Sequence, residues 1–248
     1  MGVGEINVNT KCDRMKIIEY ASERNILVEF QDEFKYVTRT TYNLFKRGKI
    51  KNPYSRTVYG IGYLGEGKYK AIKGSNSRYD TWRSMIKRCY SEKEHMEHSS
   101  YKNCTVSEEW HNFQNFAKWY DENYYEVEGE RVCLDKDILV KGNKVYSPNT
   151  CVFAPYRING MFIGCGKKQR SLPIGVDYDK KLDKFRVKCY NKDRKQVTLG
   201  LFFDKYEAFF TYKNFKEKVI REVADEYKNK IPKKLYDALY NYEVDILD

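Results

Sequence analysis

The amino-acid sequence predicts an α+β protein made of several small modules. Alternating apolar residues near the N-terminus indicate short strands, two stretches in the middle carry the apolar stripe of a helix, and three strand-like segments precede a long helix near the C-terminus. A chain of 248 residues is typical of two or three small domains. We expect a small β-rich accessory module over 1–70, a ββα core with preceding helices over 71–165, and a three-stranded antiparallel sheet packed on a helix, with a C-terminal helix, over 166–248.

Three strands are predicted in the first module, over residues 15–20, 26–30 and 34–37. In the second module, a helix is predicted over 77–90, and another begins near Ser107, which suits an N-cap. Apolar side chains recur at helical spacing in both. The stripes are Trp82, Met85, Ile86 and Cys89 in the first helix, and Trp110, Phe113, Phe116, Ala117 and Tyr120 in the second.

The third module reads as three strands joined by turn-forming residues, followed by a long helix that Asp204 caps and a short helix that begins after Pro232. The strands are predicted over 172–179, 184–190 and 195–202. Residues 166–203 hold 11 Lys and Arg but only 4 Asp and Glu, so the positive charge is concentrated over this sheet.

The composition favours a polyanionic partner. The chain has 46 Lys and Arg against 35 Asp and Glu, a formal net charge of +11. Each Lys or Arg that faces a phosphate releases condensed counterions, so this excess favours nucleic acid. The alternative is that the charge only confers solubility. The 23 tyrosines can stack on bases, although most are expected to be half-buried core or surface residues.

Cysteine use and hydropathy predict a cytoplasmic protein with no membrane contact. The seven cysteines, an odd number, form no CxxC pair and no zinc-like spacing, which favours reduced thiols. The first residues lack the apolar core of a signal peptide, and no apolar run reaches the roughly 18 residues of a membrane helix.

One segment, LDKDILVKGNKVYSPNTCVFAPYRIN over residues 134–159, carries candidate chemistry. Asp135 ends a predicted strand and Asn159 lies on the helix that follows a turn-rich second strand. Both side chains offer oxygen donors, and Mg²⁺ or Mn²⁺ suits so sparse a set, since Mg²⁺ keeps several waters. The alternative is structural, a hairpin that leads into a helix.

This segment resembles the HNH family of nucleases, in particular phage-borne homing endonucleases with a ββα-metal core. LDKDI resembles the family's D-H-x-D element, YSPNTC resembles its Y-S-P-x-N-C element, and the two preceding helices have counterparts there. The resemblance implies that Asp135 and Asn159 bind the metal. Lys136 stands where many members have the histidine base, and Asn149 lies one residue early. Lys136, Asp137 or a metal-bound water are the alternatives for the base.

The third module resembles the ethylene-response-factor type of DNA-binding domain, through IGV at 174–176, KFRV at 184–187, LGLF at 199–202 and EAFFTY at 207–212. Such domains lay their sheet in the major groove. The resemblance implies that Arg186 and Lys188 reach base edges. Phosphate contacts would come from Lys184, Arg194 and Lys195, and Tyr190 lies on the same face. A solvated polar sheet face is the alternative.

The resemblance favours a sequence-recognising endonuclease of double-stranded DNA, located in the host cytoplasm if phage-encoded. One alternative is a catalytically inactive DNA-binding regulator, or a phage inhibitor that binds a host defence protein. The other is a module whose basic face binds an acidic protein or RNA.

Overall fold

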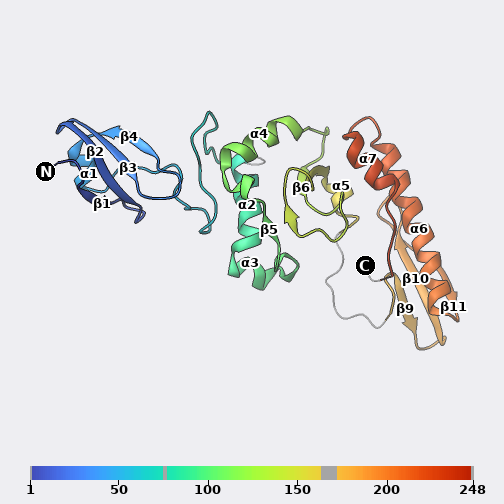
Figure 1. The fold of residues 1–248 in the computed structure, drawn as a ribbon. Helices are drawn as coiled ribbons and strands as arrows, with labels where there is room; N and C mark the ends of the chain where they lie inside the picture. Colours follow the sequence, from blue (N-terminus) through green and yellow to red (C-terminus); the bar gives the residue numbers. More distant parts are fainter. Residues whose placement is uncertain (1, 75–76, 163–171, 247–248) are drawn as a thin grey trace. The chain divides into compact units, whose positions relative to one another are not determined.

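The computed structural model describes residues 2–74, 77–162 and 172–246, and it confirms the α+β class (Figure 1). The chain folds into two compact units. The first comprises Met1–Glu122 and Lys144–Ser147, and the second comprises Asn123–Asn143 and Pro148–Asp248. These borders differ from those predicted at residues 70 and 165. The assignment of separate roles to three modules stays a prediction.

The first unit begins with a four-stranded antiparallel sheet, in the order β1-β2-β3-β4. The strands are β1 (Ile6–Val8), β2 (Arg14–Ser22), β3 (Asn25–Phe30) and β4 (Val37–Thr40), and the short helix α1 (Tyr42–Lys46) follows them. The alternation predicted in β3 is confirmed, because Ile26, Val28 and Phe30 are fully buried and share one core with residues of β2 and α1.

The strand predicted at 34–37 begins later than expected. Asp32 Oδ1 accepts hydrogen bonds from the backbone N–H groups of Phe34 and Lys35, at 3.0 Å each, and Lys35 has a φ of 50°. This turn keeps the chain out of extended geometry, so β4 starts only at Val37.

The segment after α1 connects the sheet to the helices of the first unit. At its start, Asn52 Nδ2 donates to Asp32 Oδ2 at 2.6 Å. Farther along, Tyr63 N donates to the carbonyl of His111 at 3.0 Å, and Phe113 N donates to the carbonyl of Tyr63 at 2.9 Å. These bonds explain why the sheet and the helices form one unit.

The helices of the first unit are α2 (Arg78–Tyr90), α3 (Glu92–Glu97) and α4 (Phe113–Asn123), with 3₁₀ turns η1 (Ser99–Tyr101) and η2 (Glu108–His111). The short strands β5 (Thr105–Val106) and β7 (Val145–Tyr146) pair in parallel. The buried stripe predicted for α2 is confirmed. The helix expected from Ser107 begins later, at Phe113. The side chain of Ser107 makes no capping bond, whereas Asn112 Oδ1 accepts from Gln114 N at 2.9 Å.

The second unit contains a two-stranded hairpin and a three-stranded sheet. The hairpin is β6 (Val132–Asp135) and β8 (Val152–Pro155), and the single helical turn α5 (Tyr156–Asn159) follows it. The sheet has the order β11-β10-β9, all antiparallel. Its strands are β9 (Val176–Asp179), β10 (Lys184–Tyr190) and β11 (Gln196–Phe202), and the helices α6 (Lys205–Glu226) and α7 (Lys233–Tyr240) follow. The strands predicted over 184–190 and 195–202 and both helices are confirmed. The strand predicted over 172–179 begins only at Val176, because a turn precedes it in which Val176 N donates to the carbonyl of Pro173 at 3.2 Å.

The long helix α6 belongs to two cores. Its N-terminal half, with Ala208, Phe209 and Tyr212, packs on Val176 and Val187 of the sheet (Figure 1). Its C-terminal half packs with α7 on the hairpin and α5. That second core includes Val152, Ala154 and Ile158 from the hairpin side, and Val219, Ile220 and Val223 from α6. Helix α6 therefore connects the β6–β8–α5 segment to the sheet.

The structure also bears on membrane-spanning helices and on the cysteines. No helix in the described residues is long and apolar enough to cross a membrane. The six cysteines within the described ranges form no disulfide with one another, and Cys165 lies outside those ranges.

Two glycines allow a matched test of the packing between the sheet and α6. Gly175 has a φ of 75°, and a Cβ there would lie 2.0 Å from Tyr212 Cδ2. Gly142 has a φ of 77°, but a Cβ there meets nothing within 4 Å. We expect Gly142→Ala to cost about 1 kcal/mol of unfolding free energy from backbone strain alone. Gly175→Ala should cost roughly 1–3 kcal/mol more, because the ring of Tyr212 must move. Urea denaturation measures both, and equal costs would contradict this account of the packing.

Candidate functional site

The β6–β8 hairpin places the predicted chemistry at the end of β6. The register pairs Asp135 with Val152 and Val132 with Pro155. Tyr156 N donates to the carbonyl of Arg131 at 2.8 Å, which turns the chain from β8 into α5. Helix α5 then lies against both strands of the hairpin.

Asp135 is a buried carboxylate, 9% exposed. Its Oδ1 accepts hydrogen bonds from the N–H groups of Asp137 and Ile138, at 2.9 and 2.8 Å, and so ends the strand in a turn. No cation forms an ion pair with it among the described residues. Burial, together with the nearby charge of Asp137, raises the pKa of Asp135 to about 6, against the two backbone hydrogen bonds that lower it.

Lys136, the next residue along the chain, is also buried. Its Nζ donates to Asp137 Oδ2 at 2.8 Å, and its carbonyl accepts from Asn143 Nδ2 at 2.7 Å. The side chain of Asp137 is 42% exposed, whereas that of Lys136 is 8% exposed. The carboxylate of Asp137 is therefore the solvent-accessible member of this ion pair.

Asn159 is the last residue of α5, and its side chain is half-buried. The helical turn is anchored by the two residues before it. Ile158 is fully buried in the core shared with α6. Arg157 pairs with Glu226 at 2.8 Å and donates to the carbonyl of Lys192 at 3.1 Å. This anchoring fixes the position of Asn159 relative to the hairpin.

The residues of this segment are chemically compatible with a divalent cation. Asp135 and Asn159 supply a carboxylate and an amide oxygen from elements in contact, and the Asp135 carboxylate lacks a cationic partner. No hydrogen bond joins Asp135 to Asn159. Within the described ranges, no three His, Cys, Asp or Glu side chains gather as a metal-binding group. The predicted ligand pair therefore stays a prediction.

Four of the predicted DNA contacts lie on one face of β10. Val187 and Cys189 are buried toward α6, so the alternate residues Lys184, Arg186, Lys188 and Tyr190 point to the opposite face. Successive side chains on this face are about 7 Å apart along the strand. In β9, Asp179 lies opposite Lys184 and Asp177 lies opposite Arg186. In β11, Leu201 lies opposite Arg186 and Thr198 lies opposite Lys188.

The cations of this face differ in their partners. Arg186 forms an ion pair with Asp179, and Lys184 Nζ lies 4.4 Å from the ring centroid of Phe203. Lys188 forms no ion pair within the described ranges. Tyr190 is the most open of the strand residues, at 58% exposure. The face therefore offers an oriented guanidinium, an unpaired ammonium and an open aromatic ring.

Arg194 and Lys195 lie in the turn between β10 and β11, and both are exposed. Asn191 shapes this turn, because its Oδ1 accepts hydrogen bonds from Asp193 N and Lys195 N at 3.1 and 2.9 Å. Arg194 has a φ of 59°. The two basic side chains thus sit at the edge of the face, where phosphate contacts were expected.

Two contributors were missed by the sequence reasoning, Asp179 beside Arg186 and Arg157 beneath the β10–β11 turn. The alternation in VDYD could have indicated Asp179, because an acidic residue of β9 lies next to the cations of the neighbouring strand β10. No local signal indicates the second, whose partners lie 35 and 69 residues farther along the chain.

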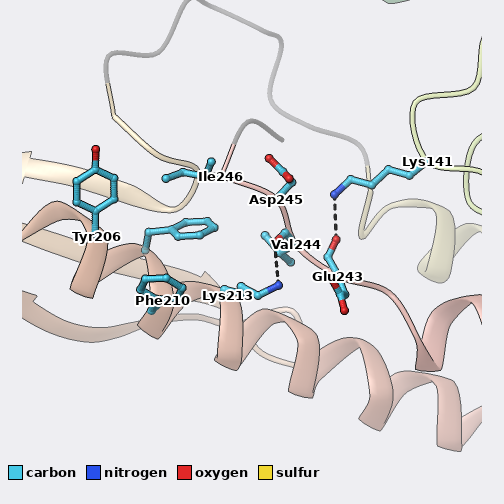
Figure 2. A pocket seen from close by; sticks show the side chains of 9 residues that line it. Lys141, Tyr206, Phe210, Lys213, Glu243, Val244, Asp245 and Ile246 are labelled. Carbon is cyan, nitrogen blue, oxygen red and sulfur yellow. Dashed lines mark hydrogen bonds between the residues drawn. The ribbon is translucent and has the colours of Figure 1, made fainter.

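A cavity of about 490 Å³ lies beside the N-terminal half of α6 (Figure 2). Tyr206 and Phe210 line one side, and Glu243 to Ile246 line the other. Lys141 donates to the carbonyl of Glu243 at 2.9 Å and Lys213 to that of Val244 at 3.0 Å. Both lysines hold the C-terminal segment in place, and the cavity contains none of the predicted site residues.

The raised pKa of Asp135 predicts a pH effect on stability. Because the folded protein binds this proton more tightly than the unfolded chain does, the stabilisation is present below pH 4 and is lost as pH rises through about 6. Asp135→Asn keeps the acceptor oxygen and removes the charge. In EDTA, we expect the variant to gain roughly 1–3 kcal/mol relative to the wild type between pH 4 and pH 7.5. Parallel stability curves over this range would contradict the pKa assignment.

No family model, no curated protein and no solved structure matches this chain. What the protein does is therefore inferred from its own residues.

Proposed function

We propose that this protein binds double-stranded DNA through the outer face of β10 and hydrolyses a phosphodiester bond at the β6–β8–α5 segment. The observation that carries the proposal is the alternation in β10. Hydrophobic side chains of β10 pack on α6, and three cations with a tyrosine lie on the opposite face of this strand, beside Asp177 and Asp179 of β9. Such a face has the donors for phosphate and base contacts.

Arg186 is the residue best suited to read a base. A guanidinium has five N–H donors, so its ion pair with Asp179 leaves others for guanine O6 and N7. The carboxylate also restricts the rotation of the side chain, which reduces the entropy lost on binding. Lys188 and Tyr190 extend the contact along the strand. Arg194 and Lys195, in the exposed turn, supply charge toward the phosphates.

In the hydrolytic step, Asp135 and Asn159 would hold a Mg²⁺ or Mn²⁺ ion. When bound, such an ion acts as a Lewis acid toward phosphate oxygens. The Asp137 carboxylate, which is accessible to solvent, accepts a proton from the water that attacks phosphorus. The bond from phosphorus to one sugar oxygen breaks, and a solvent water protonates that leaving oxygen. Lys136 holds that carboxylate by an ion pair, in which its ammonium donates to Asp137 Oδ2. This arrangement favours Asp137 over Lys136 as the base.

A second candidate function is DNA binding without hydrolysis, as a regulator or as an inhibitor of a host defence complex. The specific observation in its favour is the buried ion pair of Lys136 with Asp137, at the position of the family's histidine. In this case Asp135 has only its structural role, in which it accepts two backbone hydrogen bonds.

A nicking assay distinguishes the two functions. Wild type, Asp135→Asn and Asn159→Ala are incubated with supercoiled and mixed-sequence DNA in Mg²⁺, Mn²⁺ or EDTA, and new ends are sequenced. Asn43→Ala, at an exposed asparagine of α1 outside the candidate site, is the matched control. We expect metal-dependent ends with the wild type and the control, and a loss of rate of at least about 100-fold in the two ligand variants.

The opposite result is equally informative. If the wild type binds DNA and leaves no new ends with either metal, hydrolysis is excluded and the second function stands.

Base reading by Arg186 is tested by changing its shape at constant charge. Arg186→Lys keeps the charge but removes the planar fork. We expect this variant to lose about 1–3 kcal/mol of discrimination at one base position, measured by selection from a randomised duplex library. Arg194→Lys, the matched control in the turn, should keep the preference of the wild type. An unchanged site preference in Arg186→Lys would exclude base reading by this residue.

A further inference from the structure

A second basic surface lies in the first unit, away from the elements used above. A cavity of about 420 Å³ is formed where the chain before α2 passes the first turn of that helix. Its lining includes Lys68, Lys70 and Arg78, together with the rings of Tyr69 and Tyr79. Among the described residues, no acidic side chain lines it.

The charge around this cavity is strongly one-sided. Residues 66–90 contain seven Lys and Arg but only Glu66 and Asp80 as acids. Asp80 Oδ2 accepts from Gly74 N at 2.7 Å, and so serves the backbone. Lys68 and Lys70 are exposed, and neither forms an ion pair in the described part of the chain.

The lining is held in place by its neighbours. Gln114 of α4 fixes the backbone of Tyr69, because its Oε1 accepts from Tyr69 N and its Nε2 donates to the Tyr69 carbonyl, both at 3.0 Å. Arg78 pairs with Asp121, and its guanidinium lies 5.8 Å from the ring centroid of Tyr69. The ring of Tyr79 packs against Phe113 at 5.6 Å between centroids.

The cavity thus combines a fixed backbone and ordered rings with two lysines that form no ion pair in the described part of the chain. The ammonium of Lys68 lies 5.1 Å from the ring centroid of Tyr69. Ammonium, guanidinium and phenol groups are all hydrogen-bond donors, and the ammonium groups carry positive charge that no lining acid offsets. This combination suits an anion with several oxygen acceptors. A phosphate of a nucleic-acid backbone meets that description.

We propose that this cavity binds the phosphate backbone of double-stranded DNA, so that the first unit contacts DNA in addition to the sheet of the second unit. The inference rests on the proposed function for its ligand. It differs from the proposed function because it assigns a DNA contact to residues outside the sheet and outside the hairpin. Two such contacts on one chain would raise the overall affinity by effective concentration.

The test is the salt dependence of DNA binding by the full-length chain. Lys68→Ala/Lys70→Ala is compared with Lys11→Ala/Lys102→Ala, which removes the same charge at two exposed lysines of the same unit, and with Lys188→Ala/Lys195→Ala in the sheet. Fluorescence anisotropy with a labelled mixed-sequence duplex gives Kd between about 50 and 200 mM salt. Removal of two phosphate contacts should reduce the slope of log K against log salt by roughly one to two.

We expect the cavity pair and the sheet pair each to weaken binding, and the control pair to match the wild type. If only the sheet pair weakens binding, the cavity proposal is overturned and the proposed function stands. If only the cavity pair does, the cavity proposal stands and the role of the sheet fails. A wild type that binds no duplex at low salt overturns both.

A second measurement locates the contact without a substitution. Acetylation of lysines in the wild type, with and without the duplex, is followed by mass spectrometry. Lys68 and Lys70 should be protected by DNA at least as strongly as Lys188, whereas Lys11 and Lys102 should react equally in both conditions. Unprotected Lys68 and Lys70 on a protein that binds the duplex would contradict the proposal.

Discussion

The continuous helix α6 is the constraint on which the second unit depends. Its 22 residues span about 33 Å, long enough to cover two hydrophobic surfaces in succession. One end buries the inner face of the β9–β10–β11 sheet, and the other end buries the β6–β8 hairpin and α5. Phe215 and Tyr242 pack against both cores, so no apolar gap separates them. A hairpin of two four-residue strands is at best marginally stable by itself, which explains its need for this helix.

This arrangement has a consequence for function, because the predicted cutting segment and the predicted DNA-contacting sheet share one rigid support. Arg157 of α5 strengthens the connection, since it pairs with Glu226 at the end of α6 and bonds the carbonyl of Lys192 in the β10–β11 turn. A phosphate bound near Arg194 would therefore lie at a fixed distance from Asn159. For a nuclease, such a fixed distance sets the offset between the recognised sequence and the cut. For a regulator, it would only stabilise the fold.

Much of the fold could be predicted because local signals agreed with the tertiary structure. The alternation in KFRVKCY, the apolar stripe of α2 and the cap at Asp204 each placed an element correctly, since these patterns depend on neighbours within one turn or strand. The two-unit division was not predicted. It arises from the bond of Tyr63 with His111 and from the core that Ile158 shares with Val219, which join segments far apart in the sequence and leave no periodic signal. The late start of α4 at Phe113 has a similar origin, because Tyr63 binds Phe113 N and Asn112 supplies the local cap.

At the candidate site, too, the sequence indicates the types of the residues, whereas the structure shows their burial and their contacts. The sequence indicated that Asp135 is an acidic side chain at a strand end, and the structure adds its burial, its two backbone bonds and its lack of a cation. A buried carboxylate without a partner is costly, and proteins keep such groups where a bound cation or a proton offsets the charge. Asn at this position would satisfy the same N–H groups with no charge, so the turn alone does not require an acid. The proposal of hydrolysis gives the charge of Asp135 a role, that of holding a cation, which the proposal of DNA binding alone does not.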